Sequence, residues 1–473
     1  MKKITFCLIV IFIACSALPV LAQNKFDKRS VAGSWMGTIN AGAVSIRVIF
    51  NLTPEGNDIL MATMDSPDQG AKNIKLGPVE VSNDSIRIPA PMILGIYTGA
   101  IRNDTLMEGI WKQAGQSIPL NLTRLKKEFT LNRPQEPKPP FSYSEEEVVF
   151  HNDKADIDLA GTLTIPEGKG PFSAAVLITG SGAQNRHEEL MGHKPFLVIA
   201  DWLTRNGIAV LRYDDRGVGK SKGNYPAATT ADFAGDAAAA LRFLRSDPRI
   251  NPKAAGLIGH SEGGLVAPIV ASTENVSFIV SLAGTGVPGD RIIYRQSADI
   301  SRAAGLDENA IEDAVSLNRQ LFSILKIEKD NQAASEKMLQ AYKEIAQQKN
   351  ATAAETEQGL QQLKNSLNPS TLTWLRYFIS TNPAPYWKNV KCPVLALNGE
   401  KDLQVAADEN LDAIAKALKS GGNKSVTTRK LPELNHLFQH SKTGAPSEYS
   451  TIEETFSPEV LGIISDWING LKL

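Results

Sequence analysis

The sequence predicts an α/β fold with a doubly wound, mostly parallel sheet and a helical cap insertion, preceded by a small all-β barrel-like or sandwich domain. Three observations predict this arrangement. Short alternating apolar and polar runs fill residues 30–130, strand-like and helix-like segments alternate from about residue 141, and a proline-rich stretch separates the two patterns. Repeated strand–helix units imply a parallel sheet that is covered by helices on both faces.

The first 22 residues are typical of a secretory signal peptide. Lys2 and Lys3 give a basic start, residues 4–14 form an apolar run, and a small-residue cleavage site precedes Gln23. The run is too short to span a bilayer. We therefore expect an exported protein, periplasmic or secreted, with no stable membrane insertion after cleavage. The competing lipoprotein interpretation requires cleavage before Cys15, whose preceding residues fit a lipobox poorly.

Length and composition narrow the class of protein. A chain of 473 residues is long enough for two or three folded units. Its formal charge is −1, or −3 without Lys2 and Lys3, and it has no basic stripe. We therefore expect no nucleic-acid partner and no anionic membrane surface. Cys392 is the cysteine that remains after residue 22, so no internal disulfide is expected, and its apolar neighbours predict a buried small side chain.

The β-rich domain is assigned to residues 23–132. Val44, Ile46 and Val48 alternate with more polar positions, and Asn-Asp pairs such as Asn83-Asp84 mark turns between the runs. About eight short strands in this length favour a small barrel or sandwich. Residues 133–140 hold four prolines in eight positions, which predicts an extended, semi-rigid linker.

Residues 141–473 form the predicted α/β domain. The expected strands and helices, in chain order, cover residues 176–178, 196–205 (helix), 208–212, 229–246 (helix), 255–258, 278–282 and 394–397. Between about 287 and 385 the strand–helix rhythm stops, and segments such as 310–329 and 332–348 read as helices. We interpret this insertion as a cap over the functional site, and the alternative is a surface excursion without a role there.

Gly259-His260-Ser261-Glu262-Gly263 is the motif that carries chemistry. It matches Gly-x-Ser-x-Gly, follows a predicted strand and opens a predicted helix, which is the context of a nucleophile elbow. Such a turn is tight, and the two glycines relieve crowding that side chains would cause. The serine hydroxyl is presented above the sheet edge, and the helix N-terminus favours developing negative charge.

A serine nucleophile needs a base and an acid, which follow it in that fold in the order acid, then histidine. Asp402 lies in the loop after the strand at 394–397, and His436 follows the predicted strand at 425–431. Asp402 would fix the His436 tautomer and stabilise its imidazolium form. Glu400 and Asp408 are alternative acids, and His440 is the alternative base.

Two backbone N–H groups would form an oxyanion hole. One belongs to Glu262, the residue after the nucleophile. The other comes from the loop after the strand at 176–178, where we name Ser181 first and Gly182 second. A plain strand-to-helix connection is the alternative interpretation of that loop.

With these motifs stated, residues 141–473 resemble the α/β-hydrolase superfamily, and within it bacterial esterases that carry Gly-His-Ser-Glu-Gly-Gly. Three further stretches carry the resemblance, at residues 192–196, 212–221 and 435–439. The resemblance implies carboxylesterase activity on short acyl chains, although peptidases occur among such relatives. The β-rich domain lies outside it.

Several other polar side chains are expected to stabilise the fold and not to act in catalysis. Residues 214–216 are expected to brace the sheet edge, and the carboxylate of Glu262 to serve structure. His187, Glu188, Glu189 and His193 lack the His-Glu-x-x-His spacing of a zinc site, so no metal is expected.

The predicted reaction is hydrolysis of a small-molecule carboxylic ester through a Ser261 acyl-enzyme, without a cofactor. A capped serine aminopeptidase or amidase is the rival enzyme, which would need a carboxylate near the cap to hold a substrate amine. A rival from another class is a ligand-binding protein whose hydrolase domain is a relic, although a relic has no reason to keep three matched residues.

Overall fold

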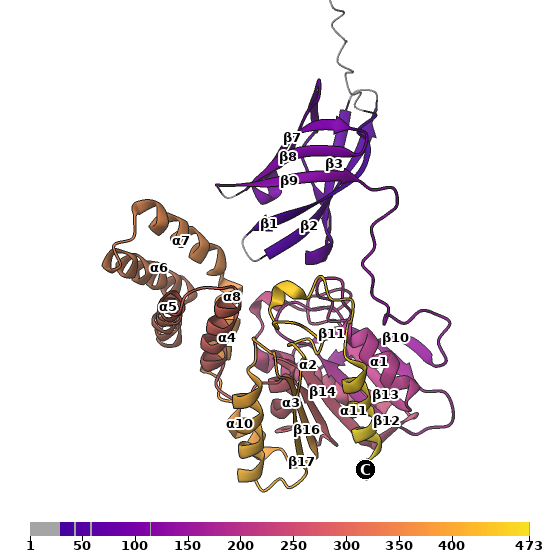
Figure 1. The fold of residues 1–473 in the computed structure, drawn as a ribbon. Coiled ribbons are helices and arrows are strands. Elements are labelled where there is room, and N and C mark those ends of the chain that lie inside the picture. The colour runs from indigo at the N-terminus through magenta and orange to yellow at the C-terminus, as the bar shows by residue number, and fades with distance from the viewer. Residues whose placement is uncertain (1–28, 42–43, 57–58, 114, 473) are drawn as a thin grey trace, which may run out of the picture. The chain divides into compact units, whose positions relative to one another are not determined.

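The computed structural model describes residues 29–41, 44–56, 59–113 and 115–472, and the chain divides into two compact units (Figure 1). The first contains most residues up to Glu128, and the second begins its main part at Phe129. The predicted signal peptide with its cleavage site before Gln23, and Cys15, lie outside the described residues.

The first unit is an antiparallel sheet of nine strands within the described residues, in the order β4-β3-β2-β1-β9-β8-β7-β6-β5. Its strands are β1 Gly33–Ala41, β2 Val44–Glu55, β3 Ile59–Ser66, β4 Ala71–Lys75, β5 Glu80–Ser82, β6 Ser85–Ala90, β7 Gly95–Asn103, β8 Leu106–Gln113 and β9 Gln116–Arg124. The prediction of an all-β part ahead of a mixed sheet is confirmed.

The short connection between β4 and β5 brings the two edges of this sheet together. The N–H groups of Leu76 and Val79 donate to carbonyls of β3, while the N–H of Gly77 donates to the Pro89 carbonyl on β6. This closure surrounds fully buried aromatic side chains, among them Trp35 and Phe50. Their burial explains the period-two pattern of the sequence, because alternate side chains point into the enclosed core.

The second unit is built on an eight-stranded sheet in the order β10-β11-β13-β12-β14-β15-β16-β17. The pairs β10–β11 and β11–β13 are antiparallel, and the remaining neighbours pair parallel. The strands are β10 Ser144–Asn152, β11 Ile157–Ile165, β12 Phe172–Ile178, β13 Ile208–Tyr213, β14 Ile250–His260, β15 Ile279–Leu282, β16 Val394–Gly399 and β17 Val426–Leu431. The central strands β13, β15 and β16 are buried throughout, and β12 is buried after its first two residues, as expected for a sheet covered on both faces.

Helices cover both faces of this sheet. Side chains of α2, α3 and α10 pack into one apolar cluster with the sheet, and those of α1 and α11 pack into another. These helices are α1 Pro195–Arg205, α2 Thr230–Ser246, α3 Gly263–Val270, α10 Ala407–Ser420 and α11 Pro458–Asn469. The predicted doubly wound, mostly parallel α/β sheet is therefore present.

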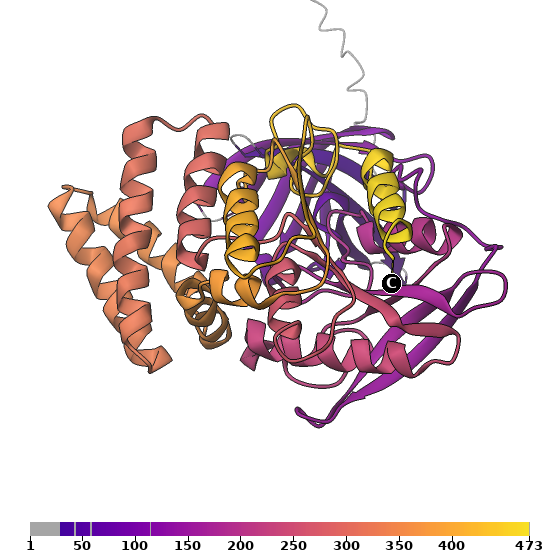
Figure 2. The ribbon, with the colours of Figure 1, turned by 90° about the horizontal axis from the view of Figure 1, so that it is seen from below.

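The segment between β15 and β16 is helical. It contains α4 Gly289–Ala303, α5 Glu308–Ile327, α6 Asn331–Gln348, α7 Ala353–Ser366, α8 Pro369–Ser380 and α9 Ala384–Asn389. Helices α4 to α8 extend together to one side of the sheet (Figures 1 and 2). A separate apolar cluster holds α4, α5, α6 and α8 together and reaches Leu265 of α3 and Val405. No helix among the described residues is long and apolar enough to cross a membrane.

Part of the predicted linker is bonded to the second unit. The Arg133 guanidinium donates to the carbonyls of Met191, Ser450 and Ile452, and the Gln135 side chain bonds the backbone of residues 455–456 in both directions. Residues 133–135, around the first of the four prolines, are thereby fixed against the loop before α11 and against Met191.

Candidate active site

Ser261 stands at the turn between β14 and α3. Its φ of +52° lies in the left-handed region, which is strained for a residue with a side chain. The Ser261 N–H donates to the Leu282 carbonyl of β15 at 2.8 Å, which holds the turn. A Cβ at Gly259 would collide with the carbonyl of Gly263, and one at Gly263 would collide with that of Ile178. The two glycines of the motif are thus required by close backbone approach.

Asp402 and His436 form a buried pair at the carboxyl ends of β16 and β17. Asp402 Oδ2 lies 2.8 Å from His436 Nδ1. The other carboxylate oxygen accepts the N–H groups of Gln404 and Val405, each at 2.8 Å. Both side chains of the pair are almost wholly excluded from solvent. The carboxylate therefore orients the ring so that Nε2 is the free nitrogen.

The alternative acid and base lie elsewhere. Asp408 is exposed and pairs with Lys430 at 2.8 Å, and Glu400 is also exposed. His440 is exposed and bonds Glu454 at 2.8 Å. Neither Asp408 nor His440 contacts the Asp402–His436 pair in any described hydrogen bond.

A cavity of about 410 Å³ brings the candidate residues together. Ser261, His436, Ser181 and Glu262 all line it. Its remaining wall includes side chains from two helices of the insertion, namely Ile292, Ile293 and Gln296 of α4 and Trp374 and Phe378 of α8. Among the described residues, Ser261 Oγ makes no hydrogen bond, so the hydroxyl is free to face a substrate. Contacts between a serine and its base are often long without substrate.

Two candidate oxyanion donors have no acceptor in the part of the chain that the structure describes. The backbone N–H groups of Glu262 and Ser181 donate to no group of the described residues, and both residues line the cavity. Gly182 follows with φ +103°, and it is Ser181 that lines the cavity. The geometry therefore favours Ser181 over Gly182 for the second donor.

The loop that carries Ser181 is braced on both sides. Asp215 accepts the Thr179 hydroxyl at 2.8 Å and the Gln184 N–H at 2.9 Å. Burial raises the pKa of the Asp215 carboxyl to about 8, against the opposing hydrogen bonds from Gln184 and Thr179. Gly180 donates its N–H to Glu188 Oε1 at 2.6 Å. The loop is therefore held by two buried carboxyl groups.

The Glu262 carboxylate connects four segments. It accepts the Ser181 hydroxyl at 2.7 Å and the Thr230 hydroxyl at 2.6 Å. The indole N–H of Trp374, on α8, reaches its two oxygens at 2.9 and 3.1 Å. Burial raises the pKa of the Glu262 carboxyl, and these three donors oppose the rise. The side chain thus links the elbow to the oxyanion loop, to α2 and to the insertion.

Residues 214–216 make structural contacts. Asp214 accepts the Arg186 guanidinium at 2.8 Å with both groups buried, and Arg216 is paired with Asp236 at 2.7 Å. These pairs tie the loop after β13 to Arg186 and to Asp236 of α2.

The histidines considered for a metal have other partners. His187 Nδ1 lies 2.7 Å from the Arg212 guanidinium, and His193 contacts Thr455 and Tyr449. Desolvation lowers the pKa of both histidines to about 4. The described residues contain no cluster of three or more metal-ligating side chains. Cys392 packs partly buried against the core, and burial raises the pKa of its thiol to about 12.

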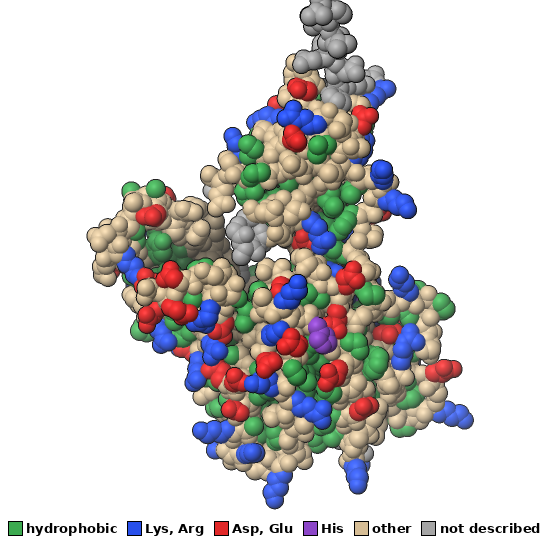
Figure 3. Space-filling view, in the orientation of Figure 1, with side chains coloured by type: hydrophobic (Ala, Val, Ile, Leu, Met, Phe, Trp, Pro, Cys, Tyr) green, Lys and Arg blue, Asp and Glu red, His purple; other side chains and the backbone are tan. Residues whose placement is uncertain are grey.

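Charged side chains of both signs are interspersed over the face of the molecule in Figure 3. The cavity wall itself carries two carboxylates, Glu188 and Glu262, and no lysine or arginine among its described residues. An anionic ligand would therefore find no lysine or arginine partner in this wall.

Comparisons with known proteins point to a hydrolase. The family model described as serine aminopeptidase, S33, matches residues 194–286. The esterase EstD of Thermotoga maritima is 28% identical over 182 residues, which are 38% of this chain and 42% of that protein. These matches support the α/β-hydrolase superfamily. They also support the conclusion that the protein is a hydrolase. The aligned region spans less than half of the length of EstD.

Solved structures give more distant matches. An esterase of Pyrococcus furiosus has a TM-score of 0.43 at 16% identity and covers 72% of this chain and 98% of its own. A hypothetical protein of Pseudomonas aeruginosa has a TM-score of 0.44 at 15% identity and covers 73% and 99% respectively.

Three residues around the site were not singled out from the sequence. Trp374 belongs to the insertion, where no pattern distinguishes it. His260 stands inside the motif, but the motif predicts no role for it, and the sequence around Glu188 points only to the rejected metal site. Their partners lie 72 to 176 residues away in the chain, so a local pattern could not reveal them.

Proposed function

We propose that this protein is a serine esterase in which Ser261 is the nucleophile, His436 the general base and Asp402 the orienting acid. The observation that carries the proposal is that one cavity is lined by a serine in an elbow turn and by a histidine bonded to a buried carboxylate. This is the constellation of nucleophilic acyl transfer.

In the proposed reaction, Ser261 Oγ attacks the ester carbonyl while His436 Nε2 takes its proton. The negative oxygen of the tetrahedral intermediate accepts the N–H groups of Glu262 and Ser181. His436 then returns the proton to the departing alcohol, which leaves an acyl-enzyme. Water attacks this acyl group by the same proton route and releases the acid.

The cavity favours uncharged esters with a short acyl chain. A volume of about 410 Å³ must hold both the acyl and the alcohol part, and Ile292, Ile293 and Phe378 make part of its wall apolar. Since these side chains belong to α4 and α8, we propose that the insertion acts as a cap that sets acyl-chain preference and excludes water.

An aminopeptidase or amidase remains the second candidate, because the matching family model is described as a serine aminopeptidase. Such an enzyme needs a free carboxylate for the substrate amine. The oxygens of Glu262 already accept three donors, and Glu188 Oε1 accepts Gly180 and His260. Both carboxylates of the cavity wall are thus already bonded within the protein, Glu188 through one of its two oxygens, and this supports ester over aminoacyl substrates.

We also propose that the protein is exported with the first 22 residues removed. The basic start and short apolar run support this. N-terminal sequencing of exported material should give Gln23, whereas an acylated Cys15 would establish a lipoprotein instead.

The function is tested with nitrophenyl esters of increasing acyl length and with aminoacyl anilides. The wild-type protein should cleave short acyl esters, and Ser261→Ala should lower the rate by about 10⁴-fold or more while the protein stays folded. Activity of Ser261→Ala within about tenfold of wild type contradicts the assignment. Preference for the anilides favours the second candidate.

A further inference from the structure

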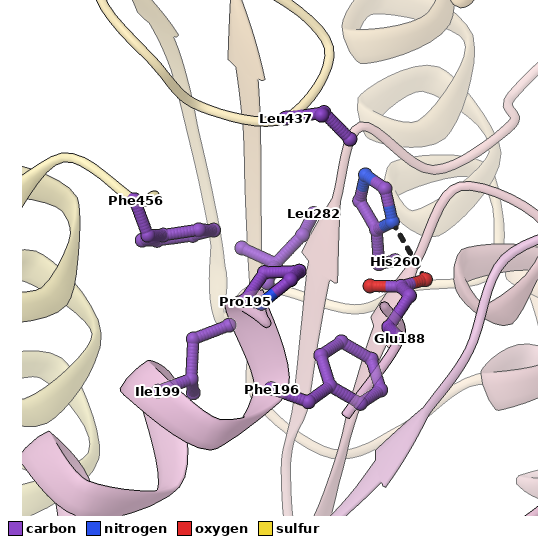
Figure 4. Close-up of a pocket in the computed structure, with 8 residues that line it drawn as sticks. All are labelled: Glu188, Pro195, Phe196, Ile199, His260, Leu282, Leu437 and Phe456. Carbon is purple, nitrogen blue, oxygen red and sulfur yellow. Dashed lines mark hydrogen bonds and ion pairs between the residues drawn. The ribbon is translucent and has the colours of Figure 1, made fainter. Parts of the chain in front are cut away.

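His260, the residue before the proposed nucleophile, is clamped between two other parts of the site. Its Nδ1 lies 2.9 Å from Glu188 Oε1, and its Nε2 lies 3.1 Å from the backbone carbonyl of His436. Both residues are buried: His260 is 7% and Glu188 is 5% exposed to solvent. Figure 4 shows the two facing each other, with Phe196 and Leu437 nearby.

The two contacts of the His260 ring favour its protonated form. Both partners of the His260 ring are acceptors, whereas a neutral imidazole has a single N–H. Whichever neutral tautomer the ring adopts, one of its nitrogens faces an acceptor without a proton, whereas a ring protonated on both nitrogens donates to both acceptors. Burial opposes a charged ring, but the Glu188 carboxylate and the hydrogen bonds outweigh it and the pKa of His260 is raised.

His193 shows the contrast. It is also fully buried, and its Nε2 also lies 2.9 Å from a backbone carbonyl, that of Tyr449. Its Nδ1, however, lies 3.0 Å from the Thr455 hydroxyl, which can donate. A neutral ring satisfies both contacts there. His260 therefore differs from an ordinary buried histidine by its link to a carboxylate.

The His260–Glu188 pair links the loop that carries Ser181 to the backbone of His436. Glu188 Oε1 accepts the Gly180 N–H, next to the proposed oxyanion donor Ser181, at 2.6 Å. His260 holds the main chain of His436, and the two rings lie 4.9 Å apart between centroids. Gly180, Glu188, His260 and His436 thus form one continuous hydrogen-bonded chain through the elbow.

We propose that His260 and Glu188 are positioning residues that hold the His436 base and the oxyanion loop in register with Ser261. Neither touches the reacting atoms. Their effect falls on the transition state, because a catalytic group displaced by about 1 Å can lose about 10²-fold in rate. The inference rests on the proposed esterase function.

The test compares His260→Phe, which removes both ring contacts, with His260→Gln, whose amide N–H can still reach the His436 carbonyl. His260→Phe should lower kcat about 10- to 100-fold with KM changed less than about threefold. The inhibition constant of an alkyl boronic acid, which forms a tetrahedral adduct with the serine, should rise by a similar factor. His260→Gln should recover part of both losses.

His193→Phe is the matched control for loss of a buried histidine. It should lower the melting temperature and leave kcat within about twofold of wild type. Wild-type kcat in His260→Phe, or an equal kcat loss in His193→Phe, would overturn the inference. If His260→Phe does not fold, Glu188→Gln decides, since it preserves size, and a wild-type kcat in that variant also overturns it. Absence of ester cleavage by the wild-type protein overturns the proposed function instead.

Discussion

Asp402 uses its two oxygens for different purposes. One accepts the N–H groups of Gln404 and Val405, and the other faces His436 Nδ1. In Asp402→Asn, the amide oxygen would stay with the two backbone donors, and the NH₂ group would face His436 Nδ1. That arrangement places the ring proton on Nε2, where the ring can no longer accept the proton of Ser261.

Asp402→Asn should therefore reduce kcat by about 10⁴-fold, with little change in melting temperature because the packing is isosteric. Asp408→Asn is the control, since Asp408 is exposed and bonded to Lys430. Steady-state kinetics on a short-chain ester measure both variants. A damaging Asp408→Asn beside an active Asp402→Asn would show that the acid is misassigned.

His193 gives a pH-dependent contribution to stability. Its pKa is lowered to about 4 in the folded protein, first by desolvation, whereas an unfolded histidine titrates near 6.5. Below about pH 6.5 His193 binds a proton in the unfolded chain, whereas in the folded protein it does so only below about pH 4. Stability is therefore lost as the pH falls through this window.

His193→Gln should remove this loss. Between pH 7 and pH 5 the free energy of unfolding of the wild type should fall by about 2 kcal/mol more than that of the variant. Urea unfolding at the two pH values measures the difference. An equal fall in both proteins would show that His193 does not titrate as its burial implies.

At the scale of elements, α4 and α8 are the helices that the proposed cap role depends on. Ile293 of α4 lines the cavity, whereas Ile324 of α5 packs inside the insertion and is not among the cavity-lining residues. Truncating each to alanine removes the same carbons from the same insertion. The pair therefore separates an effect on the cavity from an effect on packing.

Ile293→Ala should shift preference toward longer acyl chains. Each additional methylene that fits the enlarged cavity contributes about 0.8 kcal/mol, or about fourfold in kcat/KM. Ile324→Ala should keep the wild-type order of preference. The measurement is kcat/KM across a nitrophenyl ester series, and an unchanged series for Ile293→Ala would argue against a cap that sets chain length.

The sequence predicted strands, helices and the elbow because these depend on local periodicity and on glycines with close backbone neighbours. The strand at 394–397 and the histidine after β17 could be anticipated from chain order. The links of Glu262 to Trp374 and of His260 to Glu188 could not, because they join residues 112 and 72 positions apart. The insertion's helices were predicted, but not which of them would face the cavity.

At the scale of the whole molecule, residues 133–136 decide where the second unit can be separated from the chain before it. Arg133 and Gln135 bond the backbone of residues 191 and 450–456, and Glu136 pairs with Lys194 at 3.1 Å. A chain that starts at Leu131 keeps these contacts, whereas one that starts at Phe141 loses them. Both lack the β unit.

The chain from Leu131 should fold and keep ester hydrolysis within about threefold of the full protein. The chain from Phe141 should melt more than about 5 °C lower, since several hydrogen bonds of about 1 kcal/mol each are lost. Circular dichroism melts and kcat/KM on one short-chain ester measure both. A folded but inactive chain from Leu131 would show that the β unit contributes to catalysis. Equal melting temperatures of the two chains would show that residues 131–140 do not stabilise the second unit.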